Sequence, residues 1–184
     1  MPERPIWLLK TKNVGTRRRH MSTFVPVAEH ADRTPLDRSQ SCRGTKIHIV
    51  GSPMTGYCHE FQRTYRCDSD DNLGYAVRLG TVDAKYVPDP ADEKYSVDQT
   101  LTGKGTLDEL ATRVRAPGPT QDFLNPANAE SIKDCQTWAL EYVRLLVSCG
   151  YIDGGAIEIA ESQVEQAKAV GLKPTGAAGI DLTK

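Results

Sequence analysis

The stretch from Glu130 to Gly150 constrains the fold more than any other part of the chain, because it is the one long segment with a helical repeat. Its apolar residues recur every three or four positions, which predicts one broad apolar stripe on a helix of about five turns. Asp134 is a good N-cap for a helix that begins at Cys135, and Ser131 could cap a longer one. Gly150 suits a left-handed helix end. The stripe consists of Ile132, Cys135, Trp138, Ala139, Tyr142, Val143, Leu145, Leu146 and Cys149.

Cys135 has two interpretations on this helix. If Asp134 is the N-cap, Cys135 lies in the first turn, where unpaired backbone N–H groups and the helix dipole favour a thiolate. A cysteine on an apolar helix face is more often an ordinary packing residue. Cys149 lies at the opposite end, where the carbonyl groups disfavour a thiolate, so we expect it to be structural. Trp138 and Tyr142 are expected in the core.

The length of 184 residues suits one domain, and we predict a single domain over residues 1–170 followed by a flexible tail over 171–184. The 23 Lys and Arg residues balance the 24 Asp and Glu residues, so no overall charge favours nucleic acid or an anionic membrane. The first apolar run is too short for a signal peptide, and no segment is long enough to span a bilayer. These features predict a soluble cytoplasmic protein without a transmembrane segment.

The five cysteines are an odd number at irregular spacings, with no Cys-x-x-Cys pair. This pattern argues against a disulfide framework and against a structural zinc site, and it favours reduced thiols. In a secreted protein, Cys58 and Cys67 could pair. We predict no cofactor and no bound metal.

Five segments have the composition and alternation of strands, which predicts an antiparallel sheet of about four to six strands packed against the long helix, an α+β fold. Residues Ala28–Gly44 are polar and predict a long exposed loop. Residues Asp68–Gly74 lack the spacing of a calcium loop and predict an acidic turn. The predicted strands are Ile6–Lys12, Arg19–Val27, Thr45–Val50, Tyr57–Cys67 and Tyr75–Val82.

Two further helices are expected. Thr106 and Glu109 match the capping-box pattern and predict a short helix over Leu107–Val114. A weaker amphipathic pattern predicts a last helix over Ile157–Val170. The basic cluster at residues 17–19 is expected to be a solvated loop or strand end.

The histidines are the other candidates for chemistry, since a cysteine nucleophile needs a base and a group that orients the base. His20 and His48 lie on predicted strands whose alternation allows both to point to one common face, with Ile47 and Ile49 on the side opposite His48. The remaining pair, His30 and His59, is expected to be solvent-exposed.

Three blocks carry a resemblance to a known superfamily: residues 19–26 (Arg-His-Met-Ser-Thr-Phe-Val-Pro), 44–51 (Gly-Thr-Lys-Ile-His-Ile-Val-Gly) and 134–143 (Asp-Cys-Gln-Thr-Trp-Ala-Leu-Glu-Tyr-Val). In this order they resemble the circularly permuted members of the NlpC/P60 papain-like superfamily. Within it they are most similar to the lecithin:retinol acyltransferase-like branch and to uncharacterised fungal proteins with the same blocks.

This resemblance implies roles for three residues. His20 would be the general base, His48 the orienting third member, and Cys135 the nucleophile, with backbone N–H groups near the helix start stabilising the oxyanion. Met21 stands where the family usually has tryptophan. Asp134 stands where asparagine is usual, and its charge would oppose formation of the Cys135 thiolate.

The leading hypothesis is therefore a thiol hydrolase or acyltransferase. Its cysteine would attack an amide or ester carbonyl to give an acyl-enzyme, and the substrate would be a peptide, an isopeptide or an acyl ester. The alternative is a catalytically inactive binding or interaction module on the same fold, such as a fungal effector-like or regulatory protein. A metal hydrolase that uses His20 and His48 lacks the support of any His-Glu-x-x-His pairing.

Overall fold

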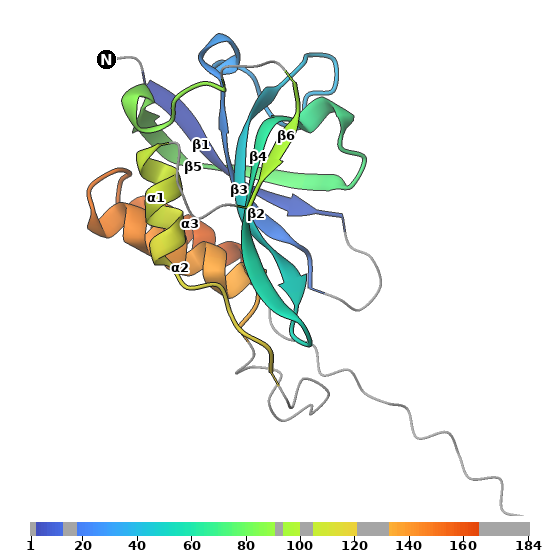
Figure 1. Ribbon diagram of the computed structural model, residues 1–184. Coiled ribbons are helices and arrows are strands. Elements are labelled where there is room, and N and C mark those ends of the chain that lie inside the picture. Colours follow the sequence, from blue (N-terminus) through green and yellow to red (C-terminus); the bar gives the residue numbers. More distant parts are fainter. Residues whose placement is uncertain (1–2, 13–17, 91–93, 100–104, 121–132, 166–184) are drawn as a thin grey trace, which may run out of the picture.

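The computed structural model describes an α+β fold, in which one antiparallel sheet of six strands is covered by three α-helices (Figure 1). The strand order in the sheet is β5-β1-β2-β3-β4-β6. The strands are β1 (Glu3–Thr11), β2 (Met21–Pro26), β3 (Arg43–Ser52), β4 (Gly56–Arg66), β5 (Leu73–Asp83) and β6 (Ser96–Asp98). The residues described are 3–12, 18–90, 94–99, 105–120 and 133–165.

The helices α1 (Thr106–Arg113), α2 (Cys135–Ser148) and α3 (Gly155–Gln163) lie together on one side of the sheet (Figure 1). Helix α2 contacts β2 and β3, α3 contacts β5, and α1 contacts β4. None of the helices among the described residues is both long and apolar enough to cross a lipid bilayer. The expected sheet packed against a long helix is confirmed.

The start of α2 is fixed by a capping box. The Asp134 side chain accepts hydrogen bonds from the backbone N–H groups of Gln136 at 2.9 Å and Thr137 at 3.1 Å, and the Thr137 hydroxyl accepts from the Asp134 N–H at 3.4 Å. These bonds satisfy N–H groups that the helix itself leaves unpaired. The helix therefore begins at Cys135. The alternative prediction of a longer helix capped by Ser131 was wrong.

The end of α2 is the glycine turn that the sequence predicts. Gly150 has a φ of +73°, its N–H donates to Val147 O at 2.9 Å, and the Tyr151 N–H donates to Leu146 O at 2.9 Å. This pair of bonds is a Schellman motif, which requires a left-handed residue at the glycine position. Cys149 is exposed, so it does not extend the buried stripe.

The main core lies between the sheet and the helices. Trp138 and Tyr142 of α2 are buried there, as expected. The Trp138 indole N–H donates to Val114 O at 3.0 Å and the Tyr142 hydroxyl donates to Leu107 O at 2.9 Å. Both aromatic side chains thus bury their apolar surface with their polar groups satisfied, which fixes α1 and the segment after it against α2.

Three helix and strand predictions need correction. The N-cap of α1 is Gly105, and Thr106 is already the first helical residue, with no side-chain cap. Helix α3 ends at Gln163 because Val164 is extended, with φ −70° and ψ 126°; residues 166–170 of the predicted helix lie outside the described part. Strand β6 was not predicted, because a three-residue strand leaves too little pattern to detect.

The expectation that His30 and His59 are solvent-exposed was also wrong. Both are buried: His30 Nδ1 accepts from the Arg43 N–H at 3.0 Å, and His59 Nε2 lies 2.8 Å from Val114 O. His59 pairs with Ile49 across β3 and β4, so strand alternation places it on the face that carries the helices. Their polar atoms are paired within the fold.

The cysteine pairing considered for a secreted protein does not fit this structure. Cys67 is buried beside Cys42, with the Cys67 N–H donating to Cys42 O at 2.9 Å, whereas Cys58 is exposed on β4. All three are free thiols.

Candidate active site

Cys135 lies at the first position of α2, where the capping box holds it, and only 9% of its surface is exposed. Burial is the largest influence on its thiol and raises the pKa to about 11. The Asp134 carboxylate raises the pKa further, while contacts with the backbone N–H groups of Met21 and of Cys135 itself, and the charge of Arg18, lower it. The thiol is therefore protonated at neutral pH.

A second polar group consists of two histidines and a glutamate in series. His20 Nε2 lies 2.7 Å from His48 Nδ1, and His48 Nε2 lies 3.1 Å from Glu60 Oε1. An ionised carboxylate only accepts hydrogen bonds, so His48 Nε2 is the donor to Glu60 and its Nδ1 is an acceptor. His20 then donates through Nε2, and its Nδ1 keeps a free lone pair. We call this arrangement the His20–His48–Glu60 relay.

Strand register assembles the relay. His20 lies directly before β2, while His48 of β3 and Glu60 of β4 are direct partners across the hairpin. The hairpin turn depends on Gly51, whose φ is +139°; a Cβ there would lie 2.1 Å from Gly56 O. Partners across an antiparallel pair have their side chains on the same face, so the turn position fixes which carboxylate meets His48.

Burial determines the charge states in the relay. It is the main reason that the pKa of His20 is lowered to about 3, and the charges of His48 and Lys46 lower it further. Burial likewise lowers the pKa of His48, against the hydrogen bond to Glu60. The hydrogen bond from His48 lowers the pKa of Glu60 to about 2. At neutral pH the relay thus holds two neutral imidazoles and one carboxylate.

The structure brings His20 and His48 together, on one common side as the sequence predicts. This common side is the face opposite the helices, because Met21, Ile47 and Ile49 pack in the helix-facing core with Cys135. Cys135 itself lies against the backbone of Met21, the residue that follows His20. The hydrogen bonds of the described residues include none between the His20 ring and the Cys135 thiol. Glu60 was missed: equal steps from the predicted turn at residues 51–56 would pair His48 with His59, whereas the observed register pairs Ser52 with Gly56 and therefore His48 with Glu60.

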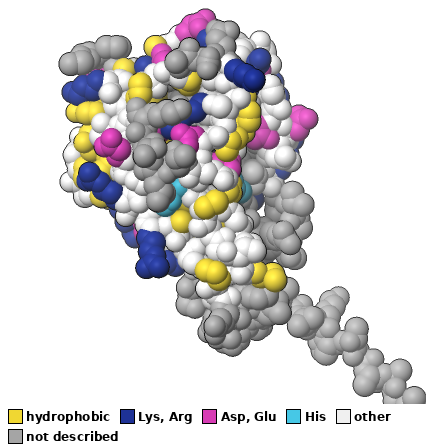
Figure 2. All heavy atoms as spheres, in the orientation of Figure 1, with side chains coloured by type: hydrophobic (Ala, Val, Ile, Leu, Met, Phe, Trp, Pro, Cys, Tyr) yellow, Lys and Arg dark blue, Asp and Glu magenta, His cyan; other side chains and the backbone are white. Residues whose placement is uncertain are grey.

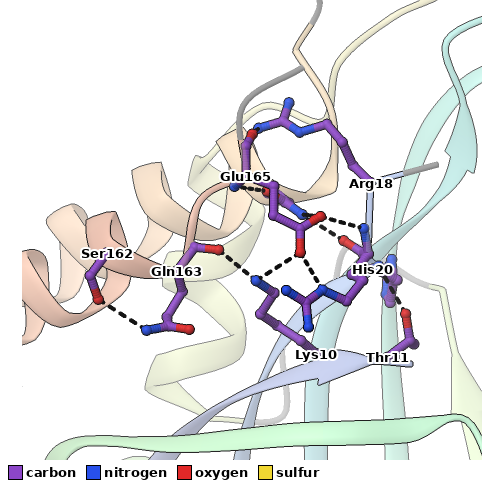
Figure 3. A network of polar contacts seen from close by, with 9 residues as sticks. Lys10, Thr11, Arg18, His20, Ser162, Gln163 and Glu165 are labelled. Atoms are coloured by element: carbon purple, nitrogen blue, oxygen red, sulfur yellow. Dashed lines mark hydrogen bonds and ion pairs between the residues drawn. The ribbon is translucent and has the colours of Figure 1, made fainter. Parts of the chain in front are cut away.

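Arg18 and Arg19, which directly precede His20, are not solvated as expected, while Arg17 lies outside the described residues. Arg18 Nη1 lies 2.9 Å from Asp134 Oδ2, and Arg19 forms an ion pair with Glu165. Figure 3 shows Glu165 and Arg18 close to His20. Both arginines therefore border the region between the relay and the start of α2.

Figure 2 shows basic and acidic side chains scattered over the face drawn there. Within the described ranges, no group of three or more His, Cys, Asp or Glu side chains is arranged to hold a metal ion.

Comparison with known proteins identifies a family but no function. No curated protein matches the chain, and no solved structure matches it. Residues 6–153 match a family of unknown function, DUF6540. This match begins in β1, ends after α2, and includes Cys135, His20, His48 and Glu60. The chain therefore belongs to the DUF6540 family.

Proposed function

We propose that this protein is a cysteine-dependent hydrolase or acyltransferase that acts on an amide or ester carbonyl. Cys135 is the nucleophile, His20 is the general base, and His48 and Glu60 position His20 and stabilise its charged form. One observation supports the proposal: the relay holds a neutral, carboxylate-backed histidine at residue 20, directly before Met21, whose backbone contacts Cys135. Strand alternation directs the His20 ring to the face of the sheet opposite Cys135, so the mechanism requires the segment before β2 to bring this ring to the thiol when substrate binds. The same three-part logic activates nucleophiles in papain-like enzymes.

The chemistry runs in two steps. The Cys135 sulfur forms a bond to the carbonyl carbon as its proton passes to His20 Nδ1; the C–N or C–O bond then breaks, and the leaving amine or alcohol takes that proton. Water or an amine next attacks the thioester and gives its proton to His20, which returns it to the sulfur. Catalytic hydrogen bonds often shorten only when substrate is bound, so the base need not contact the thiol beforehand.

The resting charges make this general-base catalysis, because a thiol with a pKa of about 11 does not transfer its proton to an imidazole with a pKa of about 3 before attack. Glu60 stabilises the imidazolium that forms in the transition state through His48. Asp134 occupies the N–H groups of Gln136 and Thr137. The N–H of Cys135 is the first-turn donor that the cap leaves for an oxyanion.

A non-catalytic binding module is the second candidate. The raised pKa of Cys135 and the Asp134 charge beside it favour this alternative, since both oppose a reactive thiolate. The two functions differ in whether the thiol attacks a carbonyl at all.

Acylation by an activated ester separates them. The protein is treated with p-nitrophenyl acetate at pH 7, and peptide mass spectrometry follows acetylation at Cys135 and at the exposed Cys58 and Cys149. We expect Cys135 to react fastest although it is the least accessible of the three. His20→Ala should slow it about a hundredfold, the usual size of general-base catalysis.

His59→Gln is the control, because this histidine is buried and contacts Val114 and Trp138 but not the relay. It should leave acetylation of Cys135 unchanged. If Cys135 reacts no faster than Cys58, and if His20→Ala leaves its rate unaltered, the enzyme proposal fails and the binding module stands.

A further inference from the structure

The segment that follows α3 is held against the start of α2 as an extended peptide. Lys10 Nζ donates to Gln163 O at 2.7 Å, the Glu165 N–H donates to Gln136 Oε1 at 2.8 Å, and Arg18 donates to Glu165 O. Main-chain groups on both sides of the extended Val164 are thus bound by side chains of other elements. We call Gln163–Glu165 the strap.

The carboxylate of Glu165 is bound by more groups than an ordinary surface ion pair. It lies 3.1 Å from Lys10 Nζ, accepts from the Arg19 backbone N–H at 3.0 Å, and is paired with the Arg19 guanidinium. Gln136 Nε2 lies 3.4 Å away. In Figure 3, Lys10 and Arg18 lie on opposite sides of Glu165. Burial would raise the pKa of Glu165, but the hydrogen bonds from Arg19 and Lys10 together lower it to about 2.

The groups that bind the strap belong to the body of the fold. The Lys10 side chain is only 3% exposed and Gln136 is fully buried, so both are held in place by the sheet and α2. Gln136 also donates to Arg19 O at 2.8 Å, which keeps its amide oriented. A buried ammonium requires an anion, and among the described residues the strap supplies it through Glu165.

The location of these groups relates them to the chemistry. Gln136 follows Cys135, Arg19 precedes His20, and Arg18 contacts both Asp134 and the strap. A peptide bound by these groups therefore passes next to the start of α2, which carries Cys135, and next to the start of β2, which His20 precedes.

We propose that Lys10, Arg18, Arg19 and Gln136 form a binding site for an extended acidic peptide, that the strap occupies this site in cis, and that the substrate of the enzyme is a peptide with a carboxylate side chain. This inference rests on the proposed function and narrows the range of substrates. The site binds a carboxylate and peptide main-chain groups, which an acidic peptide supplies and an acyl lipid lacks.

The experiment uses the full chain with Glu165→Ala and two probes, the acetylated and amidated peptides Gln-Val-Glu and Gln-Val-Gln. The tethered strap acts at an effective concentration of about 1 mM or more, so it competes with an added peptide in the natural protein. Binding is measured by ¹H–¹⁵N NMR titration. We expect Glu165→Ala to bind Gln-Val-Glu about fivefold more tightly than the natural protein does, and more tightly than it binds Gln-Val-Gln.

Two variants serve as controls. Glu161→Ala removes another carboxylate near the strap, one that pairs with Arg144 on the exposed side, and should bind like the natural protein. Adding Lys10→Met to Glu165→Ala should remove the preference for Gln-Val-Glu. Equal binding of the two peptides by Glu165→Ala, or equal gains from Glu161→Ala, overturns the inference. If Glu165→Ala loses the dispersed NMR spectrum of a folded chain, Glu165→Gln, which keeps the side-chain shape without the charge, replaces it.

Peptide binding and acetylation together separate this inference from the proposed function. The titration is repeated on the double variant Glu165→Ala, Cys135→Ser, which binds peptide without a thiol, and acetylation of Cys135 is followed in the natural protein. Binding of Gln-Val-Glu without any acetylation of Cys135 in the parent chain would retain the peptide site and reject the enzyme. Rapid acetylation of Cys135 without a preference for Gln-Val-Glu would retain the enzyme and reject the peptide site.

Discussion

The relay and the strap lie on the two sides of one short segment, residues 18–20, and they are built in opposite ways. The relay joins His48 to Glu60, 12 positions apart, through direct pairing of neighbouring strands. The strap joins Lys10 to Gln163, 153 positions apart, through a hydrogen bond from a side chain to the main chain and not through strand pairing. The relay therefore follows from the sheet, whereas the strap depends on how the end of α3 docks.

The two networks also differ in what sets their protonation. Burial holds the relay histidines neutral, with Glu60 as the one charge. In the strap, cations and hydrogen bonds outweigh the burial of Glu165 and keep it ionised. Desolvation penalises the charged form, while opposite charges favour it, so neighbouring polar networks respond to different variables. The relay should respond to pH, and the strap to salt.

The largest effect is expected from pH acting on the relay. His20 is neutral when folded, but the unfolded chain takes up a proton below about pH 6.5, so the free energy of unfolding falls as the pH falls from about 6.5 towards 3. At about 1.4 kcal/mol per pH unit, His20 alone contributes about 2 kcal/mol between pH 6.5 and 5. Urea unfolding at these two values measures it.

His20→Gln is the control for this pH dependence. It should lower the slope of the unfolding free energy against pH by about 1.4 kcal/mol per pH unit, which corresponds to one proton. Glu60 does not contribute in this range, because its carboxylate, whose pKa is about 2, titrates at lower pH. An unchanged slope would mean that burial does not hold His20 neutral, and the contrast with the strap would then disappear.

A smaller effect is expected when the strap loses its charge. Glu165→Ala leaves Lys10 buried without its anion and should lower the free energy of unfolding by about 1 kcal/mol, less than for a fully buried pair because Glu165 is 25% exposed. The difference should shrink at 1 M NaCl, where exposed charge pairs are screened. Urea unfolding at 0.1 and 1 M NaCl tests both statements.

The matched variant for the strap is Glu161→Ala, which removes an exposed ion pair with Arg144 and should cost less than about 0.5 kcal/mol. Equal losses from the two variants would show that the strap is an ordinary surface contact.

The smallest effect is expected at Asp134, which lies between the two networks. Asp134→Asn keeps a good N-cap but loses the ion pair with Arg18, so the free energy of unfolding should fall by about 0.5 kcal/mol. It removes a charge that raises the pKa of Cys135, so acetylation by p-nitrophenyl acetate at pH 7 should rise about threefold to tenfold. Equal acetylation rates of Cys135 in the two proteins at pH 7 would show that the Asp134 charge does not act on the thiol.

Local patterns were sufficient for parts of the fold and of the candidate site. The repeat of α2, its cap at Asp134 and its end at Gly150 each depend on residues within a few positions of one another, and all three are confirmed. The common side of His20 and His48 follows from strand alternation. The cap of α1 was wrong, because Thr106 matches the pattern of a cap while the backbone places Gly105 there.

What the sequence by itself determined is the set of elements and the face on which each histidine lies, since helix and strand periods are properties of adjacent residues. Only the tertiary structure decided that Glu60 completes the relay, that Lys10 and Gln136 are buried, and that Glu165 returns to bind them. These outcomes depend on strand register, on chain closure over more than a hundred residues, and on desolvation. Strand register, chain closure and desolvation are not encoded in a local pattern, because each depends on segments that are far apart in the sequence and meet only in the folded protein.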